Sequence, residues 1–110
     1  MLELRPNCEH CNKDLAPDAP DAMICSFECT FCLECVETVL KKVCPNCGGN
    51  FCQRPVRPTV NWKNNNNLAN NPARSSRFHR PVDLAAHQEL LARQAAQANK
   101  ASQANMLQQT

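Results

Sequence analysis

The stretch from residue 25 to residue 47, "CSFECTFCLECVETVLKKVCPNC", decides how this chain folds, because six of its 23 residues are cysteine. Three further cysteines stand at positions 8, 11 and 52. The N-terminus, "MLELRPNCEHC", lacks the basic start, the apolar run and the cleavage site of a signal peptide. We therefore expect a cytoplasmic protein with no membrane span, in which reduced thiols bind metal rather than form disulfides.

The spacing of the cysteines predicts two metal sites with four sulfurs each. Eight of the nine fall into close pairs, and the last pair, Cys44-Pro-Asn-Cys47, is followed by the only two glycines of the chain. Two cysteines three positions apart in a tight turn can both reach one ion at the usual zinc–sulfur distance of about 2.3 Å. Pro45 presets this turn, and Gly48 can adopt the positive φ that follows it. At the first pair, Asn12 takes the place of Gly48.

Two other residues near these pairs have less specific expected roles. His10 does not have the spacing that the metal-binding turn needs, so we expect an exposed loop residue rather than a ligand. Cys52 is the ninth thiol and is expected to be a small buried side chain on a third strand. A reactive or spare-ligand role for Cys52 is the alternative.

Charge is divided unevenly along the chain. Residues 1–52 hold eight acidic residues and four basic ones, whereas residues 53–110 hold eight basic residues and only two acids. The overall charge of +2 therefore combines an N-terminal part at −4 with a C-terminal part at +6. We expect the basic part to pair with its own acidic part, and nucleic-acid contact through residues 54–80 is the alternative.

The expected fold of residues 1–58, the head, is a small zinc-stabilised α+β domain. A chain of this size cannot fold on apolar burial alone, so it needs a metal or disulfide staple. Residues 22–25 and 30–31 are candidates for a short β-hairpin. Residues 33–42 are expected to form one central helix of about three turns, and a third strand is expected within residues 50–56.

Beyond the head we expect two further segments. Residues 59–82 form a basic linker rich in Asn and Pro, whose residues 61–76 are expected to be disordered. Residues 83–110 read as an Ala/Gln-rich helix with Asp83 as its N-cap. Leu84, Leu91 and Ala98 recur every seven residues, which is enough only for weak self-association through this helix.

The order of the cysteine pairs resembles that of RING-type zinc domains. A pair, a spacer, a pair, a third pair two residues later, a spacer and "CPNC" follow the RING pattern, and "ECTFCLEC" is similar to its central motif, with cysteine at position 29 instead of the usual histidine. The resemblance covers residues 8–47 and implies a cross-brace, in which alternate pairs share one zinc. It implies a first site of Cys8, Cys11, Cys32 and Cys35, and a second of Cys25, Cys29, Cys44 and Cys47.

Three stretches also resemble a small bacterial family of unknown function, number 1272. They are the opening "MLELRPNCE", the "ICSFECTFC" core and the closing "CPNCGG". The resemblance implies no biochemical role. Members of that family are expected to end soon after "RPVRP", so the rest of this chain is expected to be an extension.

Function is expected to be non-catalytic. Four sulfurs on each zinc leave no open position for water, and the chain has no Gly-rich phosphate loop. We expect a structural zinc module that acts as a scaffold or binds a protein partner whose identity the sequence does not reveal. One alternative is an iron–sulfur electron carrier using Cys29, Cys32, Cys35 and Cys44. Another is RING-like ubiquitin-ligase activity, which is disfavoured because His10 and Gly48 replace the aliphatic and basic residues that ligase RINGs usually have there.

Overall fold

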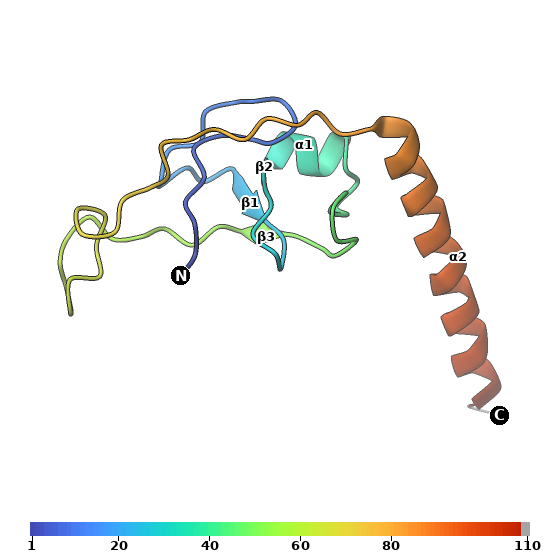
Figure 1. Ribbon diagram of the computed structural model, residues 1–110. Helices are drawn as coiled ribbons and strands as arrows, with labels where there is room; N and C mark the ends of the chain where they lie inside the picture. Colours follow the sequence, from blue (N-terminus) through green and yellow to red (C-terminus); the bar gives the residue numbers. More distant parts are fainter. Residues whose placement is uncertain (109–110) are drawn as a thin grey trace.

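The computed structural model describes the backbone of residues 1–108 and the side chains of residues 1–98 (Figure 1). It shows a small α+β fold with three strands and two helices in the described part of the chain. No helix in that part is both long and apolar enough to cross a membrane. The elements, in chain order, are β1 (Ala22–Ile24), β2 (Thr30–Cys32), α1 (Leu33–Thr38), β3 (Cys52–Gln53) and α2 (Leu84–Gln108).

The strands form one antiparallel sheet in the order β2-β1-β3. β1 and β2 make the predicted hairpin, with Met23 opposite Phe31. β3 pairs with the other edge of β1, where Ile24 lies opposite Cys52. The third strand is shorter than expected, because Pro55 has no backbone N–H with which to continue the ladder. Cys52 is exposed on this edge strand, so the prediction of a buried side chain is wrong.

Helix α1 ends at Thr38, four residues earlier than predicted. Lys41 and Lys42 both have positive φ, 53° and 66°, and so lie beyond the helix rather than in its last turn. The Lys42 N–H donates to the Val36 carbonyl, six residues earlier, at 2.8 Å, so the chain folds back over the end of the helix. This early reversal returns the chain toward the sheet and positions Cys44 near β1.

The core of the head consists largely of cysteines and a few apolar side chains. Phe31 is 1% exposed and packs edge-on against Phe51, with 5.7 Å between the ring centroids. Val36 and Leu40 from α1 and the following turn are also buried. So thin an apolar core agrees with the expectation that the head needs a further staple.

Arg54 belongs to this core and not to a basic surface. Its side chain is among the largest fully buried ones of the described chain. The guanidinium donates to the carbonyls of Arg5 and Ala16, at 2.9 Å each. Burial lowers the pKa of Arg54. This residue ties the N-terminal segment and the loop before β1 to the end of β3, so it is not available for nucleic acid.

Residues 59–82 contain no helix or strand, but they are not without contacts. The Asn-rich loop is bonded by its own side chains, and Asn67 is buried. Asn side chains can satisfy nearby backbone groups in place of a ladder, which explains how such a polar loop is held. The chain then runs back along the N-terminal segment (Figure 1). The structure thus differs from the disordered segment expected over residues 61–76.

Helix α2 begins as predicted. The Asp83 carboxylate accepts the Ala86 N–H at 3.1 Å, which is an N-cap contact. His87 Nε2 donates to the Leu40 carbonyl at 2.7 Å, and Gln94 Nε2 donates to the Gly48 carbonyl at 2.7 Å. These bonds attach the first turns of α2 to the head, and the rest of the helix projects away from it (Figure 1).

Candidate metal centres

The first cysteine group brings together the pair before the sheet and the pair at the start of α1. Its four sulfur atoms lie within 4.8 Å of one another. The Sγ atoms of Cys11 and Cys32 are 3.8 Å apart. Four sulfurs placed tetrahedrally about 2.3 Å from a zinc ion would be about 3.8 Å apart, so this donor set fits such an ion. The group consists of Cys8, Cys11, Cys32 and Cys35.

The second cysteine group contains three of the four predicted residues. The sulfur atoms of Cys25, Cys44 and Cys47 lie within 4.8 Å of one another. Backbone amides already donate to two of these sulfurs: the Phe27 N–H to Cys25 Sγ at 3.3 Å, and the Gly49 N–H to Cys47 Sγ at 3.4 Å. Amides aimed at sulfur stabilise thiolates, as expected of a metal-binding loop.

Cys29, the fourth residue predicted for this site, lies beside the group but not within it. It is buried near the start of β2, and the Cys25 N–H donates to its carbonyl at 3.2 Å. Its sulfur accepts a bond of 3.5 Å from Asn46 Nδ2. Because Asn46 stands between Cys44 and Cys47, Cys29 adjoins the loop that carries the other sulfurs.

Two turns, which we call knuckles, carry the first and the last cysteine pair of the chain and have the same backbone geometry. In the first knuckle, residues 8–12, the Asn12 N–H donates to the Cys8 carbonyl at 2.9 Å. In the second, residues 44–48, the Gly48 N–H donates to the Cys44 carbonyl at 2.8 Å. Asn12 and Gly48 have φ values of 65° and 77°. The expectation that Asn12 and Gly48 fill equivalent positions with positive φ is confirmed.

Burial and hydrogen bonding change the acidity of the thiols in opposite directions. Burial raises the pKa of the Cys35 and Cys44 thiols above the ordinary cysteine value. For Cys11, burial also acts upward, but hydrogen bonds from the Lys13 backbone and from neighbouring thiols outweigh it and lower the pKa. Buried thiols with raised pKa values become thiolates only beside a cation, so the two groups suit a metal ion.

His10 is in neither group. It is half-buried rather than exposed, and its Nδ1 accepts the Val82 N–H at 2.9 Å. Glu9, which the sequence does not single out, is 3% exposed. Its carboxylate accepts bonds from Arg5 Nη1 and from the Thr30 N–H, and so it joins the first knuckle to β2. Its position between two cysteines gives no sequence signal for this role.

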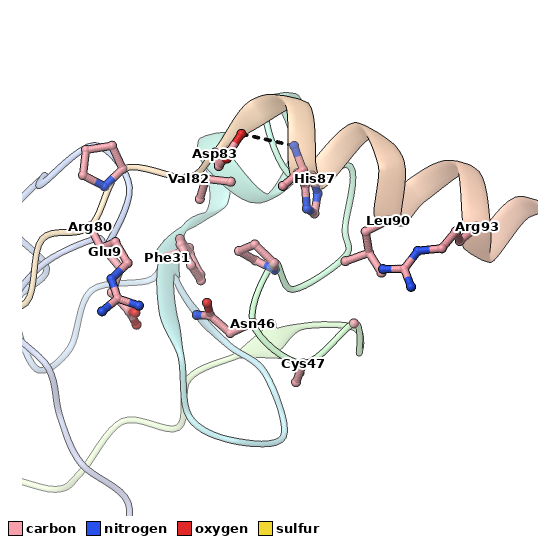
Figure 2. Close-up of a pocket in the computed structure, with 14 residues that line it drawn as sticks. Glu9, Phe31, Asn46, Cys47, Arg80, Val82, Asp83, His87, Leu90 and Arg93 are labelled. Atoms are coloured by element: carbon pink, nitrogen blue, oxygen red, sulfur yellow. Dashed lines mark hydrogen bonds between the residues drawn. The ribbon is translucent and has the colours of Figure 1, made fainter.

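A cavity of about 530 Å³ lies between the second knuckle and the start of α2 (Figure 2). Phe31, Asn46, His87 and Leu90 are among the residues that line it. His87 is 4% exposed, and its Nδ1 has no hydrogen-bond partner in the described part of the chain. Cys47 also lines the cavity, which therefore adjoins the second cysteine group.

Comparison with known proteins identifies the family. Residues 1–57 match the family described as "Protein of unknown function (DUF1272)". This chain is a member of that family. A relative with a longer match is an uncharacterized protein of Rhizobium meliloti (strain 1021), which is 54% identical over 85 residues, or 77% of this chain and 94% of the relative. No solved structure matches the chain.

The length of that alignment corrects one expectation about the tail. The family match ends at residue 57, whereas the alignment with the Rhizobium meliloti protein takes in 85 residues of this chain. At least 28 aligned residues therefore lie beyond residue 57. The tail is thus not wholly an extension peculiar to this chain, since part of it is shared with that relative.

Proposed function

We propose that the two cysteine groups are structural zinc sites in a RING-like cross-brace, and that the chain is a non-catalytic protein-interaction or scaffold module. The supporting observation is that the groups are interleaved. The first joins the first and third cysteine pairs, whereas the second joins members of the second and fourth. Between the two pairs that bind one ion, the chain therefore contributes a pair to the other ion. This is the cross-brace that the RING pattern implies.

Cys29 is proposed as the fourth ligand of the second zinc. Its neighbours support this role: its backbone is bonded to Cys25, and its sulfur contacts Asn46 in the second knuckle. Zinc prefers four ligands in structural sites, and the other three sulfurs are already close together. Exposed Cys52 lies on β3 and is not part of the proposal.

The role proposed for zinc is folding rather than catalysis. A bound ion of this type supplies about 10 to 16 kcal/mol near neutral pH, which is large beside the stability of a small domain. With four protein sulfurs on each ion, no position would remain for a reacting water. Ligase activity is disfavoured because Gly48, where ligase RINGs have a basic residue, instead lies against Gln94 of α2.

An iron–sulfur centre is also disfavoured by the positions of the sulfurs. That alternative requires Cys29, Cys32 and Cys35 to share one cluster. In the described chain Cys32 and Cys35 instead belong with Cys8 and Cys11, and Cys29 lies with the second knuckle. A colourless protein with two zinc ions would remove this alternative.

Metal content of matched variants tests the proposal. The purified chain should contain two zinc ions, measured by mass spectrometry of the metal. Cys29→Ser should weaken the retention of one ion in a chelator competition, whereas Cys52→Ser, the control, should retain both like the native chain. Equal retention by the two variants would exclude Cys29 as a ligand. A native chain without bound metal would contradict the proposed function itself.

A further inference from the structure

Residues 77–82, which we call the strap, lie along the first knuckle. Three backbone N–H groups of the strap donate to the head: Phe78 to Asn7 Oδ1 at 3.3 Å, Arg80 to the Glu9 carbonyl at 2.8 Å, and Val82 to His10 Nδ1 at 2.9 Å. The donors are alternate residues. Alternate N–H groups of an extended chain point to the same side. The head therefore presents a row of acceptors that matches the repeat of an extended peptide.

The Asn7 side-chain amide bonds both the N–H and the carbonyl of Phe78. Its Nδ2 donates to the Phe78 carbonyl at 2.9 Å while its Oδ1 accepts the Phe78 N–H. Asn7 is 1% exposed, and its Nδ2 also contacts the Cys8 carbonyl and Asn12 Oδ1, at 3.1 Å each. The amide is thus held in place by the head itself, so little freedom is lost when a peptide binds.

Three strap side chains contact the head: His79 Nε2 donates to the His10 carbonyl at 3.0 Å, and the contacts of the other two would select a sequence. Arg77 donates to the Asn12 carbonyl at 2.7 Å and to the Asp14 carboxylate at 2.6 Å. Val82 packs against the buried cluster of the head. Phe78 remains 48% exposed, with the Arg80 guanidinium 5.3 Å from its ring centre. The surface therefore reads an arginine and, five positions later, an aliphatic residue.

The strap is held in a way that permits exchange. The Arg77–Asp14 ion pair is largely exposed, with 41% and 86% of the two side chains accessible, and exposed pairs contribute little. Among strap side chains, only Val82 packs against the buried cluster in the described part of the chain. Backbone bonds, one charge, the His79 ring and the Val82 side chain recognise an extended peptide without needing the rest of the tail.

We propose that this face of the head, formed by Asn7, Glu9, His10, Asn12 and Asp14, binds an extended segment of another protein. That segment carries an arginine and, five positions later, an aliphatic residue, and the strap is its intramolecular competitor. The inference rests on the proposed function, because it names the kind of partner that the zinc module binds. The acidic character of residues 1–52 favours such a basic segment.

A binding experiment on the full chain tests this inference. The probe is a fluorescent peptide with the sequence of residues 74–83, "RSSRFHRPVD", followed by anisotropy. Phe78→Pro removes the strap N–H that Asn7 accepts and so weakens the internal competitor. The tethered strap competes with the peptide at an effective concentration of about 1 mM. Losing one hydrogen bond weakens this competitor about tenfold, so the variant should bind the peptide about tenfold more tightly than the native chain.

Modified peptides provide a control that cannot affect folding. N-methylation at the residue equivalent to Phe78 removes the bonded N–H and should weaken binding about tenfold. N-methylation at the next residue is the matched control, because the His79 N–H donates to no acceptor in the described part of the chain, and it should change binding little. Equal effects of the two modifications, or no tighter binding by Phe78→Pro, would overturn the inference.

Zinc content and mass, measured on the same samples, separate the possible failures. Two bound zinc ions without peptide binding would refute the peptide surface and leave the zinc sites intact. Loss of zinc from the native chain would refute the proposed function instead. A native dimer in which the strap of a second copy occupies this surface would also overturn the inference, because the surface would then serve self-association.

Discussion

Replacing Arg54 by methionine should destabilise the head far more than its position in a basic stretch suggests. The side chain is 2% exposed and donates to two carbonyls at 2.9 Å. Hydrogen bonds from a charged group contribute about 1.5 to 3 kcal/mol each, so the pair is worth about 3 to 6 kcal/mol. Methionine fills a similar volume and removes the cost of burying a charge, which leaves a net loss of about 2 to 4 kcal/mol.

Urea unfolding followed by circular dichroism measures this loss, with free zinc held constant because bound metal shifts the apparent stability. Arg57→Met is the matched control. Arg57 also donates to two carbonyls, those of Leu2 and Asn71 at 2.7 Å, but it is only half-buried. We expect the control to lose about 1 kcal/mol or less. If Arg54→Met were no less stable than Arg57→Met, the buried guanidinium would not be a main support of the head.

Three other outcomes are expected. A strong zinc chelator should unfold residues 1–58, seen as loss of dispersed amide signals in NMR spectra. Gly48→Ala should cost about 1 to 2 kcal/mol in urea unfolding, because its φ is 77° and the new Cβ would lie 3.1 Å from Gln94 Nε2, whereas Gly49→Ala should cost much less. The hydrogen bond from Arg74 lowers the pKa of Glu3 below its usual 4.5. This contact should be complete above that value and lost as the pH falls through the lower folded value, and Arg74→Gln should return the NMR-titrated pKa toward 4.5.

Cysteine spacing was the most informative feature of the sequence. Close pairs form turns whose shape depends on few residues, and Asn12 and Gly48 provide the positive φ that these turns need. Which two pairs form the first group followed only from the resemblance to RING-type domains, because the shape of each turn does not decide which turns share an ion. In the second group Cys29 stands apart from the other three sulfurs. Spacing identifies which cysteines are near one another in the chain, but it does not determine the direction of each side chain.

The features that the sequence did not predict depend on tertiary contacts. Lys41 and Lys42 have left-handed backbone conformations that few residues other than glycine signal, so the sequence predicts too late an end for α1. Arg54 looks like a surface residue until its two carbonyl partners are known. The strap was predictable only as a charge imbalance, because its register on the first knuckle depends on backbone bonds. The division at residues 58 and 82 stays a prediction.

The interleaving of the two cysteine groups also determines what would happen to a cut chain. Asp18 is exposed in the loop between the first knuckle and β1. Cleavage after Asp18 would leave Cys8 and Cys11 on a short fragment and every other cysteine on the long one. Under the proposed function, the first ion would then be bound by two separate polypeptides. Such a nicked chain should stay joined with zinc and come apart in a chelator, which would make it a split protein whose reassembly reports free metal.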